Sequence, residues 1–367
     1  MKNKDIPEVH FADIAVSAME SGKTLPAKFR RLLKQQLDKQ IIDKKRIGIK
    51  MHFGSQLGFS TIHPLFIRIL VEELKEAGAR HIKIMDNHPA DGIPRGYTRE
   101  VLGCDVVSTF GATRKYLKKE KIGFKSLDFV EFGGEALDSD FFICLSHVKG
   151  HGDCGFGGAI KNIAMGVVPG ESRSKLHHLE GGIAYDPKKC TLCMKCIKHC
   201  PNGAISKVKD KNEIAIFFHH CTYCQHCVMV CPEKALKMEN RRFEDFSEGM
   251  ALVTRKFLNH FQPQNLLFIN VLLDITMFCD CWGLTTPNLV PDIGILLSHN
   301  ITSIERASLD LIQKEPFLKK GLPKGRKRLK GKGHLFERIH GKDPYRMITA
   351  LEKGLGHSAK YLLKPAE

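Results

Sequence analysis

The sequence lacks any long apolar run. No window approaches eighteen uncharged apolar residues, and the most apolar stretch, Asn265–Ile275, is interrupted by Asp274. A membrane-spanning helix is therefore excluded on length. Residues 1–21 also lack the uninterrupted apolar core of a signal peptide. We expect a soluble, cytoplasmic protein.

The sequence is not unusual in its overall composition. Apolar residues make up 43% and charged residues 26% of the 367 residues, which are ordinary values for globular domains. The formal net charge is +17, but much of the excess lies in the segment Lys319–Lys332. This segment has no acidic or aromatic residue, so we interpret it as a solvated loop, with a nucleic-acid or partner patch as the alternative.

The thirteen cysteines do not form the pattern of a disulfide framework. Eight of them lie in two short runs, and a cytoplasmic protein keeps the others reduced. Cys104 and Cys144 are expected in the core. The eight clustered cysteines therefore call for a metal-based explanation.

Strand and helix patterns alternate between Lys45 and about Lys161. The sequence pattern predicts strands at 46–54, 81–87 and 141–149 and a helix at 64–78. The pattern resumes after residue 239 with helices at 244–258 and 303–312, strands at 265–275 and 293–300, and a closing helix at 344–363. The sequence predicts an α/β fold with a mainly parallel sheet and flanking helices.

The cysteine-rich segment differs in composition and holds an internal repeat. Residues 190–205 are echoed by residues 221–236, and each copy ends in Cys-Pro, two residues, alanine and an aliphatic residue. We therefore predict an inserted α+β ferredoxin-like module. The expected domains are an α/β domain (1–184), the module (185–238), the continuation of the α/β domain (239–315), and a basic linker with a C-terminal helix (316–367).

Each cysteine run has the spacing C-x₂-C-x₂-C-x₃-C-P. In two-cluster ferredoxins the first three thiolates hold one [4Fe–4S] cluster, and the fourth comes from the other run. One cluster is assigned to Cys190, Cys193, Cys196 and Cys231, and the other to Cys200, Cys221, Cys224 and Cys227. Zinc is the alternative, but zinc sites use separated pairs of ligands. Fully cysteine-ligated clusters have no open iron site, so they relay electrons.

The stretch Ser146–Asn162 combines glycines with ligand-type side chains after a predicted strand. Glycines let the backbone approach a ligand, and a following helix offers N–H donors to an anion. The candidate anion-binding residues are Gly155, Gly157, Gly158 and Lys149. The candidate catalytic or metal-binding residues are His147, His151, Cys154 and Lys161. The alternative is a glycine-rich loop that packs against the cysteine module, with exposed histidines.

A second candidate segment follows the strand 265–275. In a strand-like run Cys279 and Cys281 point to one side and Asp280 to the other. The two thiols are candidates for metal binding or redox chemistry, and small buried core residues are the alternative. Ligands of parallel sheets gather at the carboxyl ends of strands, where His52, Asp86 and His88 also occur, although turn chemistry explains the last two.

These motifs together resemble the uncharacterised iron–sulfur-centre proteins that carry domain of unknown function 362. The resemblance covers roughly Val9–Leu311 and is carried by the two cysteine runs and by three quoted segments, "KMHFGSQLGFSTIHP", "SHVKGHGDCGFGGAIKNIAMG" and "DITMFCDCWG". It implies an α/β domain with an inserted two-cluster ferredoxin module, and it supplies no substrate.

A more distant similarity concerns the glycine-rich stretch. His151, the three glycines, Lys161 and the later Pro169-Gly170 pair are similar to the set with which lactate racemases hold a nickel-pincer nucleotide. The resemblance implies a phosphate-bearing cofactor or substrate, or an additional metal.

The sequence predicts an iron–sulfur protein that passes electrons through two [4Fe–4S] clusters to a ligand or metal site in the α/β domain, as an iron–sulfur oxidoreductase. The alternative is a non-catalytic, ferredoxin-like electron-transfer protein. Nucleic-acid binding through the basic tail is the least supported. A redox partner protein (ferredoxin, flavodoxin or reductase) and an anionic small molecule are the expected partners.

Overall fold

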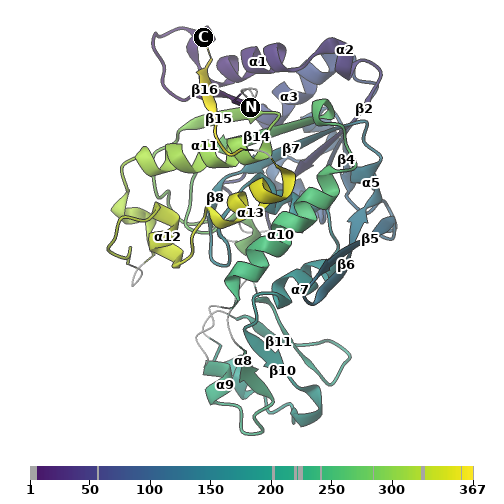
Figure 1. Ribbon diagram of the computed structural model, residues 1–367, viewed down its shortest axis with the longest axis vertical. Coiled ribbons are helices and arrows are strands. Elements are labelled where there is room, and N and C mark those ends of the chain that lie inside the picture. The colour runs from purple at the N-terminus through teal and green to yellow at the C-terminus, as the bar shows by residue number, and fades with distance from the viewer. Residues whose placement is uncertain are drawn as a thin grey trace.

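The computed structural model describes residues 6–55, 58–200, 203–218, 221, 226–239, 242–283, 285–323, 327–356 and 358–366. Its centre is an eight-stranded sheet with the order β16-β1-β15-β14-β7-β2-β3-β4 (Figure 1). The strands are β1 (Glu8–Asp13), β2 (Arg46–Met51), β3 (His81–Asp86), β4 (Asp105–Ser108), β7 (Phe141–His147), β14 (Leu266–Leu272), β15 (Gly294–Ser298) and β16 (Leu362–Pro365).

The sheet is mainly parallel, as the sequence predicts. Neighbouring strands from β14 through β7, β2 and β3 to β4 run in one direction. Strand β15 is antiparallel to both β14 and β1, and β16 is parallel to β1. The fold is therefore mixed α/β, with one strand of this sheet running against the others.

Helices cover both faces of the sheet. They are α1 (Leu25–Gln36), α2 (Lys39–Ile42), α3 (Pro64–Glu76), α4 (Arg99–Leu102), α5 (Gly134–Leu137), α6 (Ala159–Gly166), α7 (Gly170–His178), α10 (Phe243–Leu258), α11 (Ile301–Lys314), α12 (Leu335–His340) and α13 (Arg346–Leu355). Phe141 and Ile143 of β7 belong to the core under α1 and α3, whereas Phe142 and Cys144 belong to the core under α6 and α10. This alternation is the period of two that a strand buried on both faces requires.

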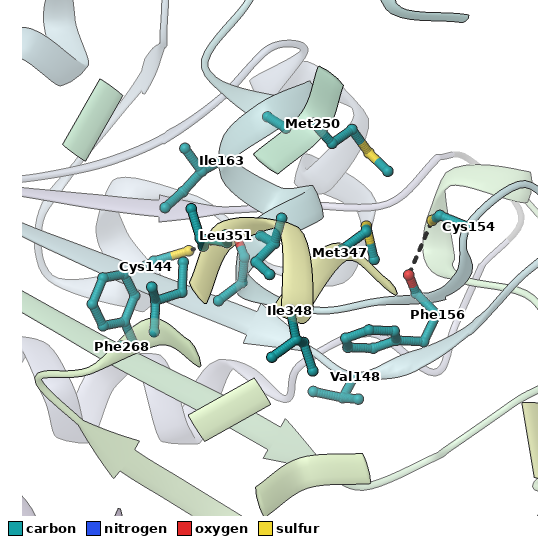
Figure 2. Packing of buried hydrophobic residues seen from close by; sticks show 14 of the residues in the cluster. Cys144, Val148, Cys154, Phe156, Ile163, Met250, Phe268, Met347, Ile348 and Leu351 are labelled. Carbon is teal, nitrogen blue, oxygen red and sulfur yellow. Dashed lines mark hydrogen bonds between the residues drawn. The ribbon is translucent and has the colours of Figure 1, made fainter. Parts of the chain in front are cut away.

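The chain end packs into the molecule. Figure 2 shows Ile348 and Leu351 of α13 in the same buried cluster as Cys144 and Phe156. The expected closing helix stops at Leu355, because Gly356 takes a φ of +64° as the helix cap. The chain then forms β16, which the sequence did not predict, at the edge of the sheet. Cys104 and Cys144 are buried, as predicted.

The cysteine-rich segment forms a small unit at the end of the molecule opposite to the two termini (Figure 1). Strand β10 pairs with β13, and β11 pairs with β12. The elements repeat as strand, helix, strand: β10 (Ile183–Tyr185), α8 (Lys195–Lys198), β11 (Ile205–Lys207), then β12 (Ile214–Ile216), α9 (His226–Met229), β13 (Leu236–Met238). The outer strands of the two copies thus pair with each other. We call residues 183–238 the cysteine module.

Two hairpins complete the fold: β5 (Leu117–Phe124) with β6 (Leu127–Gly133), and β8 (Lys149–His151) with β9 (Gly155–Gly157). Within the described part of the chain, every helix is too short or too polar to cross a bilayer.

Candidate active site

A cavity of about 390 Å³ lies at the carboxyl ends of β2, β3 and β7. Open parallel sheets bind ligands at this edge. The residues that line the cavity come from four sheet-end segments, from α6 and α7, and from the cysteine module. The lining includes Lys50, His52, Asp86, His147, Gly157, Gly158, Lys161, Asn162, Arg173, His177, Phe217, Phe218, Cys279, Asp280 and Cys281.

Asp280 joins two of the predicted site residues in one ion-pair group. Its Oδ1 accepts a hydrogen bond from Lys149 Nζ at 2.7 Å, and its Oδ2 lies 2.9 Å from His147 Nδ1. Burial alone would raise the pKa of Asp280, but Lys149 and His147 outweigh it and hold the pKa well below its ordinary value. Lys149 also donates to Ser60 O. Its ammonium group is therefore engaged by protein atoms and does not serve as the predicted anion-binding group.

A second group of the same composition lies at the neighbouring strand ends. Asp86 Oδ1 accepts from Lys50 Nζ at 2.8 Å, and Asp86 Oδ2 lies 3.1 Å from His52 Nδ1. Burial opposes ionisation here too, and Lys50 with His52 lowers the pKa of Asp86. The sequence shows the pattern as Lys-x-His in one strand and His-x-Lys in the other, but spacing alone did not reveal the aspartate partners.

Lys161 brings the two predicted segments together. Its Nζ lies 3.9 Å from Cys279 Sγ and 3.7 Å from Cys281 Sγ. These two cysteines form a disulfide, so the expectation that every cysteine outside the two runs is reduced was wrong for this pair. Ligand atoms of His151, Cys279 and Cys281 all lie within 4.8 Å of one another. Burial lowers the pKa of Lys161. A cation this close to sulfur stabilises a thiolate when the disulfide is reduced.

The Cys279–Cys281 segment is a turn and not the strand-like run that the sequence suggested. Asp280–Trp282 form a 3-10 helix, so the side-chain alternation of a strand does not hold here. Instead Asp280 is held by Lys149 and His147, and the two sulfurs meet. The prediction of a strand-like run at Cys279–Cys281 was therefore wrong, because the backbone turns here as a 3-10 helix.

The glycine-rich stretch forms the β8–β9 hairpin and the start of α6. The N–H groups of Ala159 and Ile160, at the N-terminus of α6, donate to the Glu305 carboxylate at 2.8 and 3.3 Å. A Cβ atom at Gly158 would lie 2.3 Å from Glu305 Oε1. The first donors of this helix thus have a carboxylate from the same chain, and Gly158 permits its approach. Burial raises the pKa of Glu305 to about 7.

Gly155 and Cys154 serve the packing of the hairpin. Gly155 has a φ of +83°, a conformation that favours glycine. Cys154 Sγ lies 3.3 Å from His151 Nδ1 and donates to Phe156 O, and its side chain belongs to the core that Figure 2 shows. Burial raises the pKa of the Cys154 thiol. Lys161 and Gly157 line the cavity, whereas Cys154 does not.

Arg173, on α7, lines the cavity, and sequence reasoning did not find it. Burial lowers the pKa of Arg173. Neither Arg173 nor Lys161 forms an ion pair with a carboxylate among the described residues. The buried carboxylates Asp86 and Asp280, which line the cavity, are engaged by Lys50 and Lys149. The cavity therefore presents two basic side chains that have no carboxylate ion pair within the described residues, which favours an anionic ligand.

The cysteine module contributes one wall of the cavity. Ile216, Phe217 and Phe218, at and after the end of β12, line it together with the sheet-end residues. Phe218 lies near the ring of His177, with 6.4 Å between ring centroids. No local sequence signal marks these aromatic residues as part of the site, because they reach it from the module.

Four of the predicted cluster cysteines surround one small cavity of the module. Cys190, Cys193, Cys196 and Cys231 all line it. Leu192 and Met194, between the cysteines, have positive φ values of 55° and 59°, and these turns wind the chain around the cavity. Four thiols from a triplet and a distant fourth are the donor set that a [4Fe–4S] cluster requires.

The second predicted set is described in part. Cys200, Cys221 and Cys227 pack in the core of the module, and Cys200 Sγ accepts a hydrogen bond from Ala204 N–H at 3.1 Å. Cys224 lies outside the described residues.

Residues 47–310 match the family model DUF362, a domain of unknown function. This chain belongs to the DUF362 family. The matched part of the DUF362 chain encloses both cysteine runs and all the cavity residues named above. A search among curated proteins finds no match.

Two solved structures are similar to this DUF362 chain. One is the lactate racemase apoprotein from Thermoanaerobacterium thermosaccharolyticum, with 11% identity, a TM-score of 0.34 and coverage of 73% of this chain and 51% of that one. The other is a protein from Thermotoga maritima, with 10% identity, a TM-score of 0.33 and coverage of 69% and 52%. The DUF362 chain thus spans about half the length of each.

Proposed function

We propose that this protein is an iron–sulfur oxidoreductase. The cysteine module would hold two [4Fe–4S] clusters, and the sheet-end cavity would bind an anionic small molecule. The observation that carries the proposal is the shared wall: the module that brings Cys190, Cys193, Cys196 and Cys231 around one cavity also lines the cavity that contains the Cys279–Cys281 disulfide.

When bound, clusters of this type take up and release single electrons. The eight cysteines would hold them, and the paired strands of the module support the ferredoxin-like interpretation. A redox partner protein of low potential would supply the electrons. The open cavity favours an enzyme over a non-catalytic electron carrier, because a carrier needs no ligand pocket.

The cavity residues have distinct roles in this proposal. Lys161 and Arg173 would bind the anionic groups of the ligand, since neither forms an ion pair with a carboxylate among the described residues. Asp280 would hold His147 in one orientation through the hydrogen bond to Nδ1. Reduction of the Cys279–Cys281 disulfide takes two electrons and two protons and leaves two thiols beside Lys161, so this pair is the electron acceptor that the chain itself offers.

The first test is chemical analysis of anaerobically purified protein. We expect about eight iron and eight sulfide ions per chain and a broad absorption near about 400 nm. Zinc without iron would contradict the proposal.

The second test concerns the disulfide. Trp282, the only tryptophan of the sequence, follows Cys281 directly. Its fluorescence should therefore change when the Cys279–Cys281 disulfide is reduced, and this change follows the reaction over time. We expect a photoreduced flavin donor to generate two alkylatable thiols at Cys279 and Cys281 in cluster-loaded protein, and the Cys193→Ser variant to lose most of this rate. Equal rates in both proteins would show that the cysteine module does not serve the cavity.

A further inference from the structure

A second group of ligand-type side chains lies buried beside the cavity. Asp153 comes from the turn between β8 and β9, His177 from the last turn of α7, and Glu180 from the segment that follows α7. Their exposed fractions are 4%, 4% and 0%. One ligand atom of each lies within 4.8 Å of the other two, and His177 Nδ1 is 2.8 Å from Glu180 Oε1.

The donor set and its spacing suit a divalent cation. Ligands at 2.0–2.1 Å in neighbouring octahedral positions are separated by about 3 Å, close to the His177–Glu180 distance. Burying two carboxylates together costs free energy, and positive charge beside them reduces this cost. Burial and the neighbouring Glu180 raise the pKa of Asp153 to about 7, although His177, Lys342 and Lys161 oppose this effect. A bound dication would allow both carboxylates to ionise.

His177 connects this group to the cavity. Its side chain lines the cavity, and its ring stacks on Phe246 of α10 with 5.1 Å between centroids. The ring of Phe218, from the cysteine module, is also stacked with the His177 ring, with 6.4 Å between centroids. The ring is thus fixed by packing, which is what a metal ligand requires in order to keep its orientation.

We propose that Asp153, His177 and Glu180 bind a divalent metal ion of the Mn²⁺ and Fe²⁺ class at the wall of the cavity. Two carboxylate oxygens and an imidazole nitrogen are ligands that this class accepts, whereas the thiolates of the cysteine module select softer metals. The proposed site goes beyond the electron transfer proposed above and does not depend on the clusters.

Mn²⁺ is the probe of choice, because it prefers these ligands over thiolates and its free form has a six-line electron paramagnetic resonance signal. Full-length protein, purified anaerobically and freed of loosely bound metal, is titrated with Mn²⁺ alone. We expect one Mn²⁺ bound per chain by the loss of the free-ion signal. Asp153→Asn and Glu180→Gln should each weaken binding at least about tenfold, since even outer-shell changes cost that much.

The matched control is His178→Gln against His177→Gln. His178 is the next residue of α7 and is exposed, so its change should leave Mn²⁺ affinity as in the unchanged protein, whereas His177→Gln should weaken it. Circular dichroism and the iron content of each variant check that it folds. The proposal is wrong if no Mn²⁺ binds up to 1 mM (on the order of the weakest metal sites in proteins), or if folded Asp153→Asn and Glu180→Gln bind it as tightly as the unchanged chain.

Discussion

The α/β domain and the cysteine module differ in how much apolar packing stabilises their folds. The domain has two extensive apolar cores, one on each face of the sheet. The described part of the module buries eight apolar residues, of which two are alanines and two are the cysteines Cys196 and Cys227. A chain of this size with so small a core is marginal without a metal or cross-links. The domain is therefore stable by packing, whereas the module has little packing of its own and, under the proposed function, would depend on its clusters.

The largest expected effect is the loss of the module fold when the clusters are removed. Because metal binding contributes directly to folding in small metal-dependent units, cluster-free protein and Cys193→Ser should become sensitive to protease within residues 183–238. The α/β domain should stay resistant. Limited proteolysis with mass spectrometry measures this. Cleavage spread equally over both regions would contradict the comparison.

The next largest effect concerns the buried ion pairs of the domain. Asp280→Asn leaves Lys149 buried without its carboxylate, so we expect the free energy of unfolding to fall by about 3–5 kcal/mol. Urea denaturation of the α/β domain measures the loss. The double variant Asp280→Asn with Lys149→Met should recover part of it, because the uncompensated ammonium is gone. No recovery would mean that Asp280 acts mainly through His147.

The pH dependence of stability tests the Glu305 carboxylate under α6. Its folded pKa, about 7, lies above the ordinary value, so the folded chain keeps a proton that the unfolded chain has released. The free energy of unfolding should therefore fall as the pH rises from about 5 to about 7, by on the order of a few kcal/mol. Glu305→Gln should remove this slope. An identical pH profile in thermal unfolding of both proteins would show that Glu305 titrates normally.

The smallest effect is expected at the glycines of the same region. Gly158→Ala would place a Cβ atom 2.3 Å from Glu305 Oε1, and the resulting shift should cost about 1–3 kcal/mol. Gly170→Ala is the control, since the nearest atom to its Cβ is Arg173 Nη2 at 3.8 Å. Denaturation midpoints measure both. A Gly158 variant as stable as the control would mean that Glu305 can move away freely.

The sequence predicted the main elements where the pattern is long and local. The spans of β2, β3, β7, β14 and β15 follow from apolar runs bounded by glycine and polar residues, and α3 follows from its proline start and apolar spacing. Strand β16 was missed, because its four residues are ordered by pairing with β1, more than 350 residues away in sequence. The closing helix was expected too long, because Gly356 ends it at Leu355 by taking a positive φ as the helix cap.

The sequence named several residues that lie in the candidate site, but it did not predict which of them contact one another. His147, His151, Lys161 and the Cys279–Cys281 pair do meet in one region. The carboxylate that occupies the start of α6 comes from Glu305, and Arg173 and Phe218 reach the cavity from α7 and the module. No spacing rule relates these residues, since their proximity depends on how helices and an inserted unit pack.

The amino-acid sequence by itself determined the cysteine spacing, the alternation of strands and helices, and the placement of polar residues at strand ends, because these depend on neighbours within a few positions. Only the tertiary structure decided which charges cancel and which remain. Lys149 pairs with Asp280 of a 3-10 helix and Lys50 with Asp86 at the end of β3, whereas Lys161 and Arg173 line the cavity without a carboxylate ion pair among the described residues. Charge balance in a buried site depends on distances across the fold, and these exist only once the chain is packed.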